Sequence, residues 1–201
     1  MKTKIVVDSS SNLYTLSGVD FVCVPLKIVT DDGEYLDTAE LDAVGMAQTL
    51  RSYKGKTGTS CPNVADWLAA YEGAEEVFVV TITGTLSGSY NAACVAGKNC
   101  MERNAARRIH VVDTLSAGPE ITLLLEKALS EQSSGAGFDE VCENLKAYQR
   151  RTHLLFALES MHNLAQNGRI SRLTATMAGV LGIRAVGQAS AEGTLEMLGK
   201  C

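Results

Sequence analysis

The sequence has no run of roughly 18 or more apolar residues, the length that a helix needs to cross a membrane. Aromatic residues are few, at 5% of the 201 residues, whereas 46% of the chain is hydrophobic. We therefore expect an aliphatic core in one large domain or two small ones. These features argue against stable insertion into a membrane.

Positive charge is also in short supply. Lys and Arg number 18 against 23 Asp and Glu, so the formal net charge is −5. Proteins that bind nucleic acid generally carry a basic surface. The balance therefore argues against general binding to nucleic acid.

The six cysteines lack the spacing of a disulfide framework or a metal site. None forms a C-x-x-C pair, and none has ligand-like spacing to the three histidines. The chain begins directly with a strand pattern, without the hydrophobic region of a signal peptide. We therefore predict reduced thiols and a cytoplasmic protein.

A cage of metal ligands is missing too. Six acids lie between Asp31 and Asp42. They fall on a turn at Asp31-Asp32-Gly33, on its predicted hairpin partner Glu34–Leu36 and at a helix start, without the spacing of a calcium loop. We interpret them as a solvated face and predict no bound metal.

Several catalytic motifs are absent. In the segment GTLSG two residues separate Ser87 from Gly84, whereas the G-x-S-x-G motif of serine hydrolases has one. Gly97-Lys98 lacks the upstream glycine of a P-loop, and no G-x-G-x-x-G follows a strand. These absences weigh against a serine hydrolase, a P-loop enzyme and a dinucleotide enzyme.

The sequence does contain a run of small polar residues between a predicted strand and a predicted helix. The apolar segment Glu76–Ile82 predicts a buried strand, and Ser89–Cys100 predicts a helix. Glycine and hydroxyl side chains lie between them, where the helix start presents unpaired N–H groups. This combination is typical of a carboxylate or phosphate site. The alternative is that Ser87 or Ser89 only caps the helix.

A second run of hydroxyls occurs in Lys56–Asn63, KTGTSCPN, before a predicted helix over Asn63–Tyr71. Pro62 suits the first position of that helix, which places Thr59 and Ser60 at its start. Two helix starts rich in hydroxyls can converge on one anion if their strands are neighbours. This convergence favours a binding site over simple capping.

Other strands alternate with helices, which indicates a mostly parallel sheet covered by helices. Asp8 ends the first strand and either supports the site or caps the next turn. The further predicted strands are Lys4–Asp8, Phe21–Thr30 with a break at Pro25, and Ile109–Asp113, and the further helices are Leu41–Tyr53, Glu120–Ser133 and Phe138–Arg151.

The pattern changes after about residue 151. No acid occurs between Ser160 and Ala191, whereas Arg169, Arg172 and Arg184 do. In an acidic protein this stretch predicts a soluble loop, a docking surface or a guanidinium near a ligand anion. The elements predicted here are strands over His153–Leu158, Ile183–Gln188 and Thr194–Leu198, a helix over Thr174–Leu181 and a turn at Glu192-Gly193.

Six motifs together resemble the DegV family of bacterial fatty-acid-binding proteins. They follow the order and spacing of that family and cover nearly the whole chain. They are KIVVDSSSN at the start, VPLKI near Pro25, TSCP at Thr59–Pro62, GTLSGSYNAA at Gly84–Ala93, HVVDT at His110–Thr114 and NGRIS at Asn167–Ser171.

The resemblance implies a two-lobed α/β fold. Residues 1–152 are expected to form the first lobe, a mostly parallel sheet covered by helices, and 153–201 the start of a smaller α/β lobe. Family members commonly continue beyond this point, so we expect the second lobe to be incomplete in this chain.

The resemblance also implies a function. A long-chain fatty acid lies between the lobes, and its carboxylate is presented to a separate fatty acid kinase that forms an acyl phosphate. The protein is then a carrier in lipid transport or fatty acid metabolism, not an enzyme, and it needs no cofactor besides the bound lipid.

Particular residues follow from the same resemblance. Thr59 and Ser87 match the pair that binds the carboxylate, and Arg169 matches an arginine implicated in the kinase encounter. Arg172 lies on the same basic stretch. The implied ligand-binding set is Thr59, Ser60, Ser87, Gly88 and Asn91.

The tail and the carboxylate of such a ligand are expected to contribute differently to binding. Burial of about 14 methylenes at ~0.8 kcal/mol each gives about 11 kcal/mol, while each charge-assisted hydrogen bond contributes roughly 1.5–3 kcal/mol. The tail would supply most of the affinity and the hydroxyls the orientation.

The competing interpretations are a small-molecule kinase or phosphotransfer module that binds phosphate on the same turns, and an interaction protein that uses its arginines.

Overall fold

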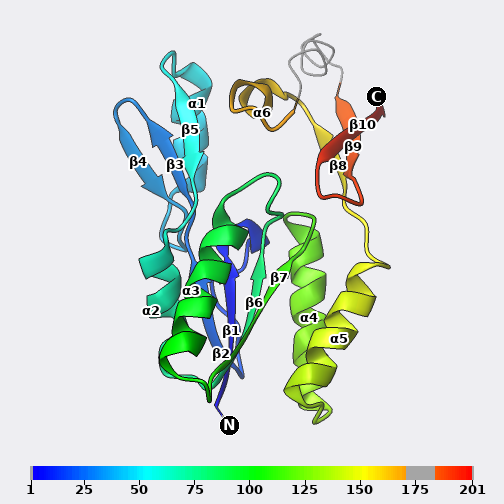
Figure 1. The fold of residues 1–201 in the computed structure, drawn as a ribbon. Helices are drawn as coiled ribbons and strands as arrows, with labels where there is room; N and C mark the ends of the chain where they lie inside the picture. The colour runs from blue at the N-terminus through cyan, green and yellow to red at the C-terminus, as the bar shows by residue number, and fades with distance from the viewer. Residues whose placement is uncertain (1, 171–183, 201) are drawn as a thin grey trace.

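The computed structural model describes residues 2–170 and 184–200 and contains three sheets (Figure 1). A parallel sheet with the order β2-β1-β6-β7 forms the lower half, and two antiparallel sheets, β4-β3-β5 and β10-β9-β8, lie beyond the carboxyl ends of its strands. The strands are β1 (Thr3–Asp8), β2 (Asp20–Val24), β3 (Lys27–Thr30), β4 (Gly33–Leu36), β5 (Thr57–Ser60), β6 (Glu76–Thr81), β7 (Arg108–Asp113), β8 (Leu155–Leu158), β9 (Ala185–Ala189) and β10 (Leu195–Lys200).

Helices cover both faces of the parallel sheet. The pair α2 and α3 lies on one face and the pair α4 and α5 on the other (Figure 1). The central strands β1 and β6 are therefore almost continuously buried, which explains their unbroken apolar sequences. The helices are α1 (Ala43–Ser52), α2 (Val64–Tyr71), α3 (Ser89–Arg103), α4 (Pro119–Ser133), α5 (Phe138–Gln149) and α6 (His162–Gln166), with a short 3-10 turn η1 (Ser9–Ser11).

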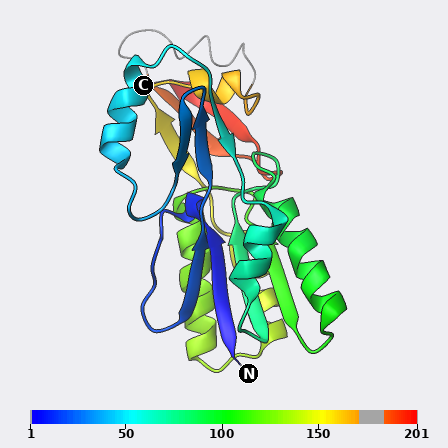
Figure 2. The same ribbon diagram turned by 90° about the vertical axis from the view of Figure 1, so that its left-hand side faces the viewer.

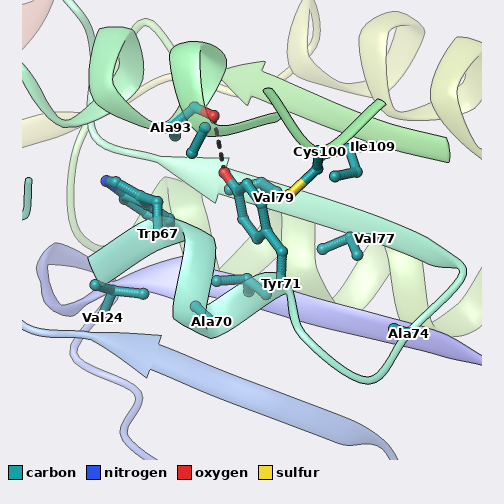
Figure 3. Close-up of a cluster of buried hydrophobic side chains, with 12 residues drawn as sticks. Val24, Trp67, Ala70, Tyr71, Ala74, Val77, Val79, Ala93, Cys100 and Ile109 are labelled. Carbon is teal, nitrogen blue, oxygen red and sulfur yellow. Dashed lines mark hydrogen bonds between the residues drawn. The ribbon is translucent and has the colours of Figure 1, made fainter. Parts of the chain in front are cut away.

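Alternate residues of the central strands supply two cores. Val6 and Val79 point to the α2–α3 side, where they meet Trp67 and Tyr71 (Figure 3). The opposite face packs Ile5, Val7, Phe78 and Val80 against α4 and α5. The sheet is thus held rigidly below the loops at its carboxyl edge.

The segment from β3 to β5 leaves the parallel sheet. It forms its own antiparallel sheet in which Thr59 pairs with Ile28. Figure 2 shows the β3–β4 hairpin and α1 rising beyond the end of β1, on the same side as the β8–β10 sheet. This position brings β5 to the edge where the parallel strands end.

The predicted elements are largely confirmed, with three differences. Strand β5 was not predicted, and neither was α6. Asn63 is the N-cap of α2, with its side chain accepting from the N–H groups of Ala65 and Asp66, so Pro62 lies before the cap and not at the first helical position. The predicted helix over Thr174–Leu181 lies outside the described residues, and the lobe boundary at residue 152 stays a prediction.

Over residues 2–170 and 184–200, every helix falls short of the length and apolar character needed to cross a bilayer.

Candidate functional site

The two predicted runs of hydroxyls lie side by side. A β-carbon added to Gly88, at the start of α3, would lie 3.1 Å from Sγ of Cys61, which directly follows β5. Ser87 precedes Gly88, and Thr59 and Ser60 precede Cys61. The structure therefore brings the two segments together as the sequence predicts.

The route to this convergence differs from the predicted one. The sequence made the convergence conditional on neighbouring strands, whereas β5 belongs to the antiparallel β4-β3-β5 sheet and β6 to the parallel sheet. Thr59 and Ser60 are exposed on β5, whereas Ser87 is half-buried in the turn before α3. The junction therefore lies between two different sheets.

The start of α3 is open to an anion. Its N-cap is Gly88, and no side chain among the described residues caps it. Ser87 Oγ accepts a bond of 3.3 Å from the N–H of Ser89, so Ser87 braces the first turn without being its N-cap. Asn91 is exposed one turn further along the helix. The N–H groups and dipole of this first turn favour a negatively charged ligand.

Asp8 supports this helix start from below. It is fully buried at the end of β1, and its Oδ2 accepts bonds from Ser89 Oγ at 2.6 Å and from the N–H of Ile82 at 3.0 Å. The Ser10 hydroxyl donates to its other oxygen. Burial raises the pKa of Asp8 above its ordinary value, against the lowering effect of these bonds. Asp8 therefore supports the start of α3, and it is also the N-cap residue of η1, so both predicted roles have contacts in the structure.

A second acid holds the same turn from the opposite side. Asp113, at the end of β7, accepts bonds of 3.1 Å from the N–H groups of Gly84 and Leu115. The N–H of Thr83 donates to the carbonyl of Ser116 at 2.8 Å. The sequence analysis gave Asp113 no role, although its place at a strand end, like that of Asp8, is the signal that could have identified it.

Arg169 joins the site to the upper part of the molecule. Its Nε donates to the carbonyl of Leu86 at 3.0 Å, and its guanidinium also bonds the carbonyl of Asn167. Asn167 Nδ2 in turn lies 3.3 Å from the carbonyl of Thr57 on β5. The segment 167–169 thus bridges both runs of hydroxyls, a role that the sequence analysis did not assign to Asn167.

The predicted arginine surface is not a single patch of free cations. Arg169 is half-buried and bonded to carbonyls, as described above, and Arg184 is exposed and paired with Glu159 at 3.1 Å. Arg172 lies outside the described residues. The two described arginines therefore have different environments, and only Arg169 contacts the candidate site.

Several of the acids between Asp31 and Asp42 have structural partners. Asp31 accepts from the N–H of Lys56, Glu34 pairs with Lys27 at 2.9 Å, and Asp37 accepts from the Tyr14 hydroxyl at 2.6 Å. In the part of the chain that the structure describes, no three His, Cys, Asp or Glu side chains form a group that could hold a metal.

A pocket of about 690 Å³ lies where α4 and α5 meet β9. This volume suits a small ligand. Ten of its fourteen lining residues are polar or charged, although apolar atoms make up the larger part of its exposed lining. The lining residues are Asp113, Thr114, Leu115, Glu120, Lys146, Gln149, Arg150, Thr152, His153, Leu154, Gln188, Ala189, Ser190 and Ala191.

Comparison with protein families gives one match over nearly the entire chain. The profile of the DegV family, described as uncharacterised proteins, matches residues 2–201. A DegV domain-containing protein of Streptococcus pneumoniae is 44% identical over 204 aligned residues, which cover 100% of this chain and 73% of that protein.

Solved structures give the same result. The Fatty Acid Kinase (Fak) B3 protein of Streptococcus pneumoniae, loaded with linoleic acid, has a TM-score of 0.97 and 44% identity. The match covers 100% of this chain and 73% of that chain. A DegV family protein from Eubacterium eligens, loaded with heptadecanoic acid, has a TM-score of 0.96 and 41% identity, with 99% of this chain and 72% of that chain covered. The two-lobed α/β fold predicted from the sequence is confirmed by this likeness.

Proposed function

Because this chain belongs to the DegV family, we propose that it binds a long-chain fatty acid and presents the carboxylate to a separate fatty acid kinase. Two relatives of similar structure hold linoleic acid and heptadecanoic acid, and one of them bears the name of a fatty acid kinase component. The observation that carries the proposal is the approach of Cys61 to Gly88, where an added β-carbon would lie 3.1 Å from Sγ, because it brings the two runs of hydroxyls together.

The carboxylate is placed between Thr59 and Ser87. The hydroxyls can donate to it, and the open first turn of α3 adds N–H groups and a favourable dipole. Ser60, Gly88 and Asn91 border the same position. The nearby cation, Arg169, is engaged by carbonyl oxygens, so the carboxylate keeps its charge and its nucleophilic character for attack on a phosphoryl donor.

The protein is proposed to act as a carrier in the cytoplasm. Five cysteines among the described residues are free thiols, as expected in a reducing compartment. Burial raises the pKa of two of them, Cys23 to about 12 and Cys142 to about 11, so both stay protonated and unreactive at neutral pH. They serve as packing groups in a protein whose chemistry is performed by its partner.

The experiment compares the wild type with the double variant Thr59→Val, Ser87→Ala. Fatty acid co-purified with each is quantified by mass spectrometry after organic extraction, and acyl-phosphate formation is measured with a fatty acid kinase from a DegV-containing bacterium. Loss of two charge-assisted bonds of about 1.5–3 kcal/mol each should reduce acyl-phosphate formation at least a hundredfold.

The matched control is Thr49→Val, Ser52→Ala on α1, where both hydroxyls bond only carbonyls of their own helix. It should behave like the wild type. If the Thr59, Ser87 variant kept full lipid content and full acyl-phosphate formation, the proposed carboxylate site would be wrong. Phosphate turnover by this protein alone would instead identify it as a phosphotransfer enzyme.

A further inference from the structure

The turn between β9 and β10 reaches the strand-to-helix turn that leads to Ser87. The Thr85 hydroxyl donates to the carbonyl oxygen of Gly193 at 2.5 Å, across 108 positions of the sequence. Oγ1 of Thr83 lies 3.1 Å from Oγ1 of Thr85. One hydroxyl of the lower half of the molecule thus binds the carbonyl of Gly193, and a second hydroxyl lies beside the first.

The β9–β10 turn presents this carbonyl in a fixed direction. Ser190 Oγ accepts bonds of 3.1 Å from the N–H groups of Glu192 and Thr194, and the N–H of Gly193 donates to the carbonyl of Ser190 at 3.0 Å. Gly193 has a φ of +80°, which a residue with a β-carbon adopts only with strain. The turn is therefore internally braced before it meets its neighbour.

The contact leaves no space for a side chain at Gly193. An added β-carbon would lie 2.9 Å from the Cα of Leu115 and 3.1 Å from the Cβ of Thr83. Leu115 itself has a φ of +54°, an unusual conformation for leucine. The nearest atom is the Thr83 hydroxyl, which could rotate away, but the Cα of Leu115 and the Cβ of Thr83 cannot be moved by side-chain rotation.

Thr83 also determines the position of Ser87. The carbonyl of Thr83 accepts bonds of 3.2 Å from the N–H groups of Leu86 and Ser87. A displacement of Thr83 is therefore transmitted directly to the hydroxyl proposed to bind the carboxylate.

We propose that Thr85 and Gly193 are positioning residues for the carboxylate site. The β9–β10 turn fixes the Thr83–Ser87 turn, so the placement of the upper sheet and the orientation of the Ser87 hydroxyl are coupled. This inference rests on the proposed function and names what controls the orientation of the ligand. The carboxylate is held in the reactive orientation only while the β9–β10 turn contacts the Thr83–Ser87 turn.

The first experiment substitutes glycines of matched backbone conformation. Gly193→Ala introduces the clash, whereas Gly135→Ala changes a glycine with a φ of +84° that has open space around it. Hydrogen–deuterium exchange at the amides of Leu86 and Ser87 is measured without lipid, and the dissociation constant for oleate is measured by displacement of a fluorescent fatty acid.

Gly193→Ala should speed exchange at both amides and weaken oleate binding by more than about tenfold, the usual result of overpacking a fixed site. Gly135→Ala should leave both measurements at the wild-type values. Unchanged exchange in a folded Gly193→Ala protein would overturn the coupling, and so would faster exchange with unchanged oleate affinity.

A second set of variants avoids the risk that Gly193→Ala fails to fold. Thr85→Val removes the hydroxyl at nearly constant shape and should weaken oleate binding about three- to tenfold, the usual effect of one neutral hydrogen bond. Thr85→Ser keeps the hydroxyl donor and should bind oleate as tightly as the wild type. If Thr85 acted through packing alone, Thr85→Val would instead bind oleate more tightly than Thr85→Ser. Thr49→Val on α1 is the control.

The two proposals fail in different ways. If the wild type binds no fatty acid, the proposed function is wrong, and the exchange of Leu86 and Ser87 still tests the docking of the β9–β10 turn. If the wild type binds oleate but Thr85→Val and Gly193→Ala bind it equally well, the positioning role is wrong and the function stands.

Discussion

Asp8 illustrates how one buried side chain organises the site without touching the ligand. It receives bonds from Ser89, Ile82 and Ser10, and these three donors come from η1, from the turn after β6 and from the start of α3. Removal from water nevertheless raises its pKa. A carboxyl group in this position is a compromise between the donors that favour its charge and the burial that opposes it.

The raised pKa of Asp8 predicts a specific pH dependence of stability. The folded protein holds the proton more tightly than the unfolded chain, whose Asp8 titrates near the ordinary value of 3.8. The contribution of Asp8 to the free energy of unfolding is therefore full below that pH and declines as the pH rises through the folded-state pKa. Asp8→Asn lacks this decline, so its stability relative to the wild type should rise between pH 4 and pH 7.

Urea unfolding at several pH values measures this difference. The carboxamide can still accept from Ser89 and Ile82 through its oxygen, which keeps the variant comparable with the wild type. The neighbouring Cys23 stays protonated over the whole range because its pKa is about 12. Asp32→Asn, at an exposed turn, is the control. If the free energies of unfolding of Asp8→Asn and of the wild type changed with pH in the same way, Asp8 would not have a raised pKa.

At the scale of elements, the sequence was most informative where burial is continuous. The apolar runs of β1, β6 and β7 predicted buried strands because both faces of the parallel sheet are covered by helices. Strand β5, TGTS, has no apolar alternation, and its pairing with β3 is a tertiary contact that no local pattern encodes. Helices α1 to α5 were predicted from apolar spacing and break signals, whereas the short α6 was not.

The candidate site was predictable only where its residues form local patterns in the sequence. The hydroxyls near Thr59 and Ser87 were visible as two runs before helices, and the structure joins them. The supporting contacts of Asn167 and Gly193 were not visible, because each is a bond over more than 100 positions of the chain. Distant polar contacts leave no periodic signal in one sequence.

The pairing of α2 with α3 links the two helix starts at the site, and one hydrogen bond within it can be tested. The buried Tyr71 hydroxyl donates to the carbonyl of Ala93 at 3.0 Å (Figure 3). Tyr71→Phe should lower the free energy of unfolding by about 0.5–1.5 kcal/mol, since it removes the bond and leaves the packing in place.

Urea unfolding at pH 7 checks this value. Tyr35→Phe, on the outer strand β4, should have no effect, because its hydroxyl makes no hydrogen bond to the residues that the structure describes. A Tyr71→Phe protein as stable as the wild type would mean that the bond adds nothing to the attachment of α2 to α3.

At the scale of the whole molecule, the site is held from two directions. The β9–β10 turn contacts Thr85, and Arg169 binds the carbonyl of Leu86, only one residue further along the same turn. Both contacts come from the upper part of the molecule, and both act on the segment before α3. Under the proposed function, we therefore expect ligand retention to depend on the contacts between the upper part and the parallel sheet.

Variants of Arg169 and Arg184 can separate two roles: holding the upper part of the molecule against the parallel sheet, and binding a kinase. The resemblance implied that Arg169 acts in the kinase encounter, whereas its bond to Leu86 predicts a role in holding the lipid as well. Arg169→Ala should therefore release bound oleate about two- to tenfold faster, the effect of one lost hydrogen bond, and should also reduce acyl-phosphate formation. Arg184→Ala, which among the described residues loses the exposed pair with Glu159, should leave oleate release unchanged.

Arg169→Lys separates charge from geometry. Lysine keeps the positive charge but lacks the planar fork that reaches the carbonyls of Leu86 and Asn167 together. If the kinase requires only the charge, this variant recovers acyl-phosphate formation while oleate release stays fast. Release at the wild-type rate from Arg169→Ala, with acyl-phosphate formation lost, would assign Arg169 to kinase docking alone and leave the seating of the upper part to the β9–β10 turn.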